Sequence, residues 1–163
     1  MKLLVTGKDG QVGGALQDIA VSRDDLEVIA LDRQALDITD KQAVQDCVRA
    51  SDCDAVINAA AYTAVDKAEE DQETAFAVNR DASVFLAEAC AEKNIPFLHI
   101  STDFVFDGRK SGAYQEDDLC APLGIYGQSK LEGEQQITRI GGKYLILRTA
   151  WVFGGKANFV NTM

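Results

Sequence analysis

Five short apolar runs alternate with longer segments of helical periodicity, and this alternation constrains the fold of the chain most strongly. The apolar runs are LLV at 3–5, EVIAL at 27–31, AVIN at 55–58, FLHI at 97–100 and YLILR at 144–148. Three of them are almost continuously apolar, which is typical of parallel strands covered on both faces. Helices are predicted around 11–21, 41–51, 72–93 and 128–140. The pattern predicts an α/β fold with a doubly wound parallel sheet, whose carboxyl edge holds the ligand site.

A glycine-rich turn, TGKDGQVGG at 6–14, directly follows the first apolar run. Gly7 permits the tight turn, Gly10 lets the backbone approach a pyrophosphate, and Gly13 allows close packing of helix on strand. Asp32 ends the second run, about 20 residues further on, where an acid can bond the adenosine ribose. This context predicts a dinucleotide-binding turn.

The choice between NADH and NADPH stays open at this point. Asp32 favours the free ribose diol of NADH, whereas the adjacent Arg33 could hold the 2′-phosphate of NADPH.

Tyr126 and Lys130 form a candidate catalytic pair at the start of the last predicted helix. Residues four apart lie on one helical face, so both side chains can enter one site. An unperturbed tyrosine has a pKa of about 10, and a lysine charge nearby is expected to lower the pKa toward neutrality. The spacing therefore favours a proton donor, Tyr126, with an electrostatic partner, Lys130.

The segment STDFVFDG at 101–108 follows the fourth apolar run. Its first residues could simply cap a turn, as Ser, Thr and Asp often do. Their place at the carboxyl end of a predicted strand favours instead a function in which a hydroxyl of this segment holds a substrate carbonyl oxygen beside Tyr126.

Composition narrows the function classes. The 163 residues suffice for one domain with a full core, and the net charge of −10 disfavours nucleic-acid and membrane partners. The apolar run in the N-terminal segment MKLLVTGKDG is too short for a signal peptide or a membrane span. These features predict a cytoplasmic protein.

The cysteines and the single histidine show no metal-ligand spacing. Cys47, Cys53, Cys90 and Cys120 form no CxxC pair, which predicts reduced thiols. His99 lies within PFLHIS and is interpreted as a hydrogen-bonded histidine at the end of a strand rather than as a catalytic group.

These motifs together resemble the extended short-chain dehydrogenase/reductase family and, within it, the dTDP-4-dehydrorhamnose reductases. The resemblance runs along nearly the whole chain. It includes TGKDGQVGGALQ at 6–17, NAAAYTAVDKAE at 58–69, STDFVFDG at 101–108, PLGIYGQSKLEGE at 122–134 and RTAWVFG at 148–154. The glycine turn and the Tyr/Lys pair are shared widely in the superfamily, whereas AVDKAE, STDFVFDG and RTAWVFG are narrower signatures.

The resemblance implies a Rossmann-like domain that reduces the C4 ketone of dTDP-4-dehydro-β-L-rhamnose to dTDP-β-L-rhamnose with NADPH or NADH, in dTDP-rhamnose and polysaccharide biosynthesis. Tyr126 would donate the proton, Lys130 would also contact the ribose, and Thr102 would orient the ketone. Further cofactor contacts would come from Gly10, Gln11, Val12, Asp37, Ile38, Ala61, Tyr62 and Thr63. The sugar nucleotide would meet Thr102, Asp103 and Trp151.

Two departures from the family pattern qualify these expectations. Members continue for well over a hundred residues into a substrate-covering region, so residues 1–163 are interpreted as the cofactor domain, with the C-terminal substrate domain absent. Some members bind magnesium through a glutamate just after the glycine turn, where this chain has Ala15. We therefore predict no such metal site. Dimerisation bridged by magnesium is not expected for the same reason, and the sequence leaves open whether the full-length protein forms a homodimer.

Two alternative functions stay open. One is a nucleotide-sugar epimerase or dehydratase with the same Tyr/Lys core, against which Trp151 and the AVDKAE segment argue. The other is a non-catalytic regulatory subunit of methionine adenosyltransferase, because a related branch of proteins serves that role.

Overall fold

The computed structural model describes residues 1–153 and is built on one five-stranded parallel sheet. The strands are β1 (Lys2–Thr6), β2 (Glu27–Leu31), β3 (Ala55–Asn58), β4 (Phe97–Thr102) and β5 (Tyr144–Thr149). Their order across the sheet is β2-β1-β3-β4-β5, so the direction of winding reverses between β1 and β3. In such sheets, ligands bind outside the carboxyl ends of the strands at this reversal. The predicted α/β doubly wound fold is confirmed.

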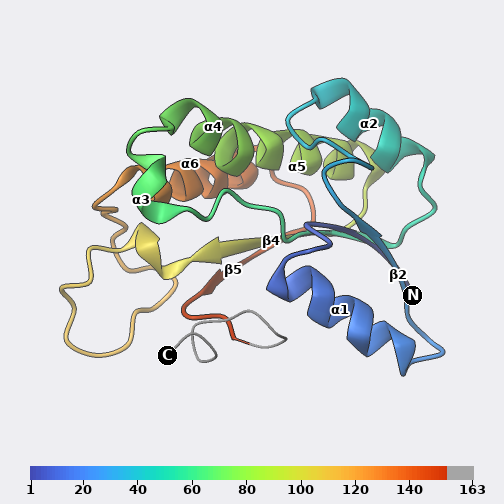
Figure 1. Cartoon of the computed structure of the whole chain (residues 1–163), viewed down its shortest axis with the longest axis horizontal. Coiled ribbons are helices and arrows are strands. Elements are labelled where there is room, and N and C mark those ends of the chain that lie inside the picture. Colours follow the sequence, from blue (N-terminus) through green and yellow to red (C-terminus); the bar gives the residue numbers. More distant parts are fainter. Residues whose placement is uncertain (154–163) are drawn as a thin grey trace.

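Helices cover the two faces of the sheet unequally. On one face lie α2 (Lys41–Ala50), α5 (Ala82–Lys93) and α6 (Ile125–Ile140), with the short α3 (Val65–Ala68) and α4 (Gln72–Phe76) beside them (Figure 1). Among the helices of residues 1–153, Figure 1 shows only α1 (Gln11–Val21) on the opposite face, below β1 and β2.

The core follows this division into two clusters. The larger one joins Leu4, Val56 and Phe97 of the strands to Val44 and Leu86 of α2 and α5. The smaller one joins Leu3, Val5 and Ile57 to the α1 side, where Leu16 packs against them. Alternate residues of each buried strand thus face opposite layers, as the apolar runs required.

The face that carries α1 is uncovered at the β4–β5 end within the described part of the chain. Leu145 and Leu147 of β5 are 52% and 41% exposed, whereas Ile146, which points to the other face, packs against the larger cluster. The last strand is therefore buried on one side only, although its sequence predicted burial on both.

The predicted helix over 72–93 is interrupted. It begins as α4, continues as a π-helical turn at Ala77–Asp81, and resumes as α5. The structure also contains α3, which the periodicity did not indicate, and α6 begins at Ile125 rather than near 128. The last residues, NFVNTM at 158–163, whose sequence predicts the start of a further helix, lie outside the described residues.

The glycine turn adopts the geometry that its spacing required. Gly7 has a φ of 79°, in the region that favours glycine, and a Cβ on Gly13 would lie 2.2 Å from the Gly7 carbonyl oxygen. The first turn of α1 therefore packs directly onto the loop that leaves β1.

Candidate active site

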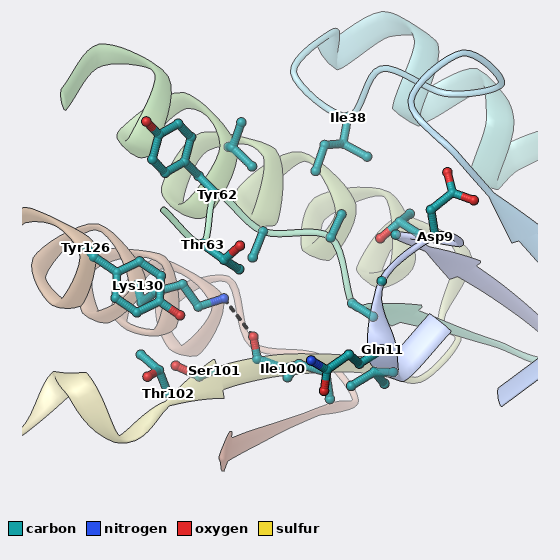
Figure 2. Close-up of a pocket in the computed structure, with 18 of the residues that line it drawn as sticks. Asp9, Gln11, Ile38, Tyr62, Thr63, Ile100, Ser101, Thr102, Tyr126 and Lys130 are labelled. Atoms are coloured by element: carbon teal, nitrogen blue, oxygen red, sulfur yellow. Dashed lines mark hydrogen bonds between the residues drawn. The ribbon is translucent and has the colours of Figure 1, made fainter. Parts of the chain in front are cut away.

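One large cavity of about 1060 Å³ runs along the carboxyl edge of the sheet. Its walls come from the glycine turn, the end of β2, the segment after β3, the end of β4 and the start of α6. Its volume reaches the upper end of the usual range for ligand sites, about 300–1,000 Å³. Figure 2 shows side chains from these separate segments converging on it.

The glycine turn supplies one end of the cavity. Gly7, Gly10, Gln11 and Val12 line it, and α1 begins directly after Gly10, which has no side chain to cap the helix. The first N–H groups of a helix and its dipole attract an anion. This end of the cavity is suited to a diphosphate.

Charged side chains surround the same end. Lys8 Nζ lies 3.5 Å from Asp32 Oδ2, and the Ala35 backbone N–H donates to the other Asp32 oxygen at 2.9 Å. The hydrogen bond from Ala35 is the main reason that the pKa of Asp32 is lowered. Arg33, whose side chain is 82% exposed, pairs with Asp37 at 3.4 Å. Asp32 is thus an ionised acceptor with Lys8 beside it, while Arg33 extends into solvent next to Asp37.

The buried side-chain amide of Asn79 holds the segment after β3 in place. Asn79 Oδ1 accepts from the Tyr62 N–H at 2.9 Å, and its Nδ2 donates to the Tyr62 carbonyl and to Ser129 Oγ at 3.1 and 3.0 Å. Asn79 belongs to the π-helical turn, and such turns often occur at functional sites. It links the wall formed by Ala61, Tyr62 and Thr63 to α6, which carries Tyr126.

Tyr126 lies between α6 and the end of β4. Its ring meets that of Phe104 edge to face, with centroids 5.5 Å apart and planes at 76°. Thr102 lies close enough to the phenol to affect its pKa, and its Oγ1 accepts from the Phe104 N–H at 3.1 Å and donates to Asp103 Oδ1 at 3.2 Å. A phenol and a hydroxyl are therefore adjacent at the cavity wall, as a ketone-binding pair requires.

The pKa of Tyr126 differs from the expectation drawn from its spacing to Lys130. Burial raises the pKa of this phenol, the nearby Thr102 hydroxyl opposes the increase, and the charge of Asp103 adds to it. Lys130 is directed elsewhere: its Nζ donates to the Ile100 carbonyl at 2.6 Å and lies 3.1 Å from Nε2 of His99 (Figure 2 draws the first contact). The expected lowering of the pKa by the lysine is therefore wrong for this structure.

Lys130 is the largest fully buried side chain in the described part, with only 1% of its surface exposed. Burial lowers its pKa to about 8, while Glu134, four residues on, acts in the opposite direction. The fully buried His99 has its pKa lowered well below 6.5 by burial and by the charge of Lys130. The single histidine is hydrogen-bonded, as predicted, but it lies within β4 rather than at its end, and its partners are Asn58 and the candidate catalytic lysine.

The start of α6 is capped from a distant segment. Glu69 Oε1 accepts from the Ile125 N–H at 2.8 Å, where Gly124 provides no side-chain cap. A carboxylate at this end also complements the helix dipole. The AVDKAE segment thus fixes the turn that carries Tyr126.

A buried ion pair ties the other side of α6 to the sheet. Glu134 accepts from Ser101 Oγ at 2.5 Å and from Arg148 Nη2 at 2.7 Å. Ser101 therefore points to α6, and its neighbour Thr102 is the hydroxyl that faces Tyr126. The burial of the acid makes this link an anchor between β4, β5 and α6.

Trp151 lies just beyond β5 with a positive φ of 49° and a side chain that is 70% exposed. A positive φ is uncommon for a bulky residue and is concentrated at functional sites. It lines the same cavity as Thr102 and Asp103.

The structure brings together all the predicted site residues except Gly13, which packs beneath the turn. The members that line the cavity are Gly7, Gly10, Gln11, Val12, Asp32, Arg33, Asp37, Ile38, Ala61, Tyr62, Thr63, Thr102, Asp103, Tyr126, Lys130 and Trp151. Sequence reasoning missed the supporting roles of Asn79, Glu69 and His99. Glu69 lies in a segment already recognised as a family signature, whereas nothing local marked Asn79.

Comparisons with known proteins agree with this geometry. The family model "RmlD substrate binding domain" matches residues 1–163. The chain belongs to the dTDP-4-dehydrorhamnose reductase family. The dTDP-4-dehydrorhamnose reductase of Aggregatibacter actinomycetemcomitans is 47% identical over 99% of this chain and 55% of its own length.

Solved structures of the family show the same fold. A dTDP-4-dehydrorhamnose reductase ortholog from Clostridium acetobutylicum matches with a TM-score of 0.94 at 41% identity, over 99% of this chain and 57% of its own. The enzyme from Bacillus anthracis, solved in complex with NADP, matches with a TM-score of 0.94 at 35% identity over the same shares. The chain therefore spans about half the length of these family members.

Two further findings concern the described residues. No group of three or more His, Cys, Asp and Glu side chains within residues 1–153 is arranged to hold a metal ion. The prediction that this chain lacks the family's magnesium site rests on Ala15 and stays a prediction. None of the helices in the same range is long and apolar enough to cross a membrane.

Proposed function

We propose that this chain is the cofactor-binding and catalytic part of a cytoplasmic enzyme that reduces the C4 ketone of dTDP-4-dehydro-β-L-rhamnose to dTDP-β-L-rhamnose. The observation that carries the proposal is the adjacency of the Tyr126 phenol and the Thr102 hydroxyl at the wall of a cavity that begins at the glycine turn. Membership of the reductase family supports the choice of substrate.

The cavity fits a nicotinamide dinucleotide. Its volume is sufficient for the cofactor. The glycine turn packs against the start of α1, where backbone N–H groups can bind a diphosphate. In the proposal, Gln11 and Val12 hold the diphosphate, Asp37 and Ile38 meet the adenine, and Ala61 to Thr63 line the remaining length. Lys130 contacts the nicotinamide ribose. When bound, the cofactor supplies the hydride.

Three side chains act on the ketone. Thr102 donates a hydrogen bond that orients the carbonyl oxygen, and Tyr126 gives that oxygen a proton as negative charge develops on it. The raised pKa of Tyr126 keeps the phenol protonated at neutral pH, as a donor requires. Asp103 and Trp151 contact the sugar nucleotide.

NADPH and NADH both remain candidates for the cofactor. The relative from Bacillus anthracis was solved with NADP, which supports NADPH. Asp32, held by Lys8 and Ala35, offers an acceptor for the ribose hydroxyls of NADH, while the exposed Arg33 offers a partner for a 2′-phosphate.

The test is oxidation of NADPH, and separately of NADH, in the presence of dTDP-4-dehydro-β-L-rhamnose. Tyr126→Phe should lower kcat about 10²–10⁴-fold, because it removes only the transferable proton, and should leave cofactor affinity nearly unchanged. Lys130→Met should damage both turnover and cofactor binding.

Tyr114→Phe is the matched control, since its hydroxyl bonds Asp107 at 3.1 Å and its ring stacks on Phe106 outside the cavity. Near-normal turnover by Tyr126→Phe would show that another group donates the proton. Interconversion of sugar nucleotides without net cofactor oxidation would identify an epimerase instead.

A further inference from the structure

A row of buried polar side chains crosses three neighbouring strands beneath the candidate catalytic pair. The sheet register places Thr6 opposite Asn58, and Asn58 opposite His99. Ser83 of α5 and Lys130 of α6 meet this row from the helical layer. All five residues are at most 1% exposed, so water does not compete for their hydrogen bonds.

The hydrogen bonds of Ser83 fix the orientation of the Asn58 amide. Ser83 Oγ donates its only proton to the Asn79 carbonyl at 2.9 Å, so it accepts from Asn58 Nδ2 at 3.4 Å. On the opposite side, Thr6 Oγ1 donates to Asn58 Oδ1 at 2.7 Å. The amide therefore directs its NH₂ group to Ser83 and to His99.

The orientation of Asn58 in turn fixes the proton on His99. Asn58 Nδ2 lies 3.1 Å from His99 Nδ1, so Nδ1 accepts and carries no proton. A neutral imidazole then carries its proton on Nε2, which lies 3.1 Å from Lys130 Nζ. His99 thus presents an N–H group to the lysine.

The neutral amine of Lys130 satisfies this arrangement and the ammonium does not. An amine accepts from His99 Nε2–H while it donates to the Ile100 carbonyl at 2.6 Å. An ammonium has no lone pair to accept from His99 Nε2–H, so two donors would point at each other. If His99 moved its proton to Nδ1 to relieve this conflict, Nδ1–H would instead point at the N–H donor of Asn58 Nδ2.

We propose that His99 is a positioning residue that holds Lys130 and sets its protonation, because Ser83 and Asn58 keep His99 as a hydrogen-bond donor to the lysine. Lys130 then gains and loses a proton near neutral pH rather than remaining a fixed cation. This deepens the proposed function, and rests on it, by specifying the protonation of the residue that is proposed to contact the nicotinamide ribose.

The charges that face Lys130 agree with this assignment. Glu134 on α6 favours the ammonium, but its carboxylate already accepts from Ser101 and Arg148. Tyr126 on the same helix is protonated, and Asp103 at the end of β4 acts on Tyr126. Burial lowers the pKa of Lys130 to about 8, in the direction that the hydrogen bonds favour.

The ring nitrogens of His99 provide a direct test, because it is the only histidine in the chain. The full chain with ¹⁵N-labelled histidine, free of cofactor and substrate, is titrated by NMR between about pH 6 and 10. We expect Nε2 to carry the proton and Nδ1 to be bare at the upper end. Both signals should change in one transition near pH 8 that Lys130→Met abolishes.

A protonated Nδ1 and a bare Nε2 above about pH 9, or a histidine that titrates with its ordinary pKa near 6.5, would overturn the proposal. Ser83→Ala frees the Asn58 amide to turn, so the transition should move upward by on the order of one pH unit. Thr138→Ala is the control, since Thr138 Oγ1 also bonds a helix carbonyl four residues back, that of Glu134, at 2.9 Å.

An unchanged transition in Ser83→Ala would also contradict the proposal. The titration involves neither turnover nor a bound ligand. Its failure would therefore leave the proposed reduction untouched, and a failure of the reduction would leave the titration unaffected.

Discussion

The two ends of the cavity are built differently. At the glycine-turn end, the walls come from β1, α1, β2 and the segment after β3, and each is fixed by packing or by buried hydrogen bonds. At the other end, the aromatic side chains of Phe104 and Trp151 are 49% and 70% exposed. The described residues thus line the proposed dinucleotide site with four segments, whereas Asp103 and Trp151, proposed to contact the sugar nucleotide, lie at exposed positions after β4 and β5.

This difference separates two requirements of the proposed reaction. The proposed proton donor is held by the buried Asn79, through Ser129, and by Glu69, which caps the start of α6 from the surface. The residues proposed to choose the sugar, Asp103 and Trp151, lie at the other end of the cavity. Catalytic geometry can therefore be complete in this chain while substrate affinity is weak.

Gly13→Ala should produce the largest change, and it acts at the glycine-turn end. Its Cβ would lie 2.2 Å from the Gly7 carbonyl oxygen, so either α1 or the turn must move. Such overpacking costs about 1–3 kcal/mol of folding stability, and we expect dinucleotide affinity to fall at least about tenfold. Thermal unfolding and calorimetric titration with NADPH measure the two effects.

Gly14→Ala is the matched control for this change. No atom lies within 4 Å of a Cβ at this position, so the substitution should stabilise the helix by about 0.5–1 kcal/mol. Equal effects of the two substitutions would show that the close contact at the turn does not determine the site.

Glu69→Ala should have a smaller effect on the free energy of unfolding, confined to the start of α6, which lies between the two ends of the cavity. It removes the acceptor for the Ile125 N–H and the charge at the start of α6, at a cost of about 1 kcal/mol in the free energy of unfolding. Glu69→Gln should recover part of the loss, because the amide oxygen still accepts. Chemical denaturation measures both, with the exposed neighbour Glu70→Ala as the control. A loss as large for Glu70→Ala would refute the capping role.

The parts of this structure that the sequence predicted are those with local causes. Strand alternation and the spacing from Gly7 to Gly13 depend on neighbours in the chain, and both were predicted at nearly the observed positions. The break at Ala77–Asp81 could not be predicted, because it depends on the hydrogen bonds of Asn79 to the distant Tyr62 and Ser129.

The same contrast holds within the site. The four-residue spacing of Tyr126 and Lys130 placed both at one cavity, but it could not show where the amine points. That direction depends on burial and on His99, which is 31 residues away in the chain. Sequence reasoning thus predicted which residues line the site better than it predicted their hydrogen bonds and pKa values.

The central claim, a dinucleotide site lined by four packed segments beside a sugar site with exposed aromatic side chains, is tested most directly by calorimetric titration of the full chain with NADPH, NADH and dTDP-β-L-rhamnose. We predict saturable one-to-one binding of at least one of the two dinucleotides, and sugar-nucleotide binding at least about tenfold weaker than that of the better dinucleotide. Circular dichroism confirms that the sample is folded. A folded chain that binds neither dinucleotide, or that binds the sugar nucleotide more tightly, would contradict the account.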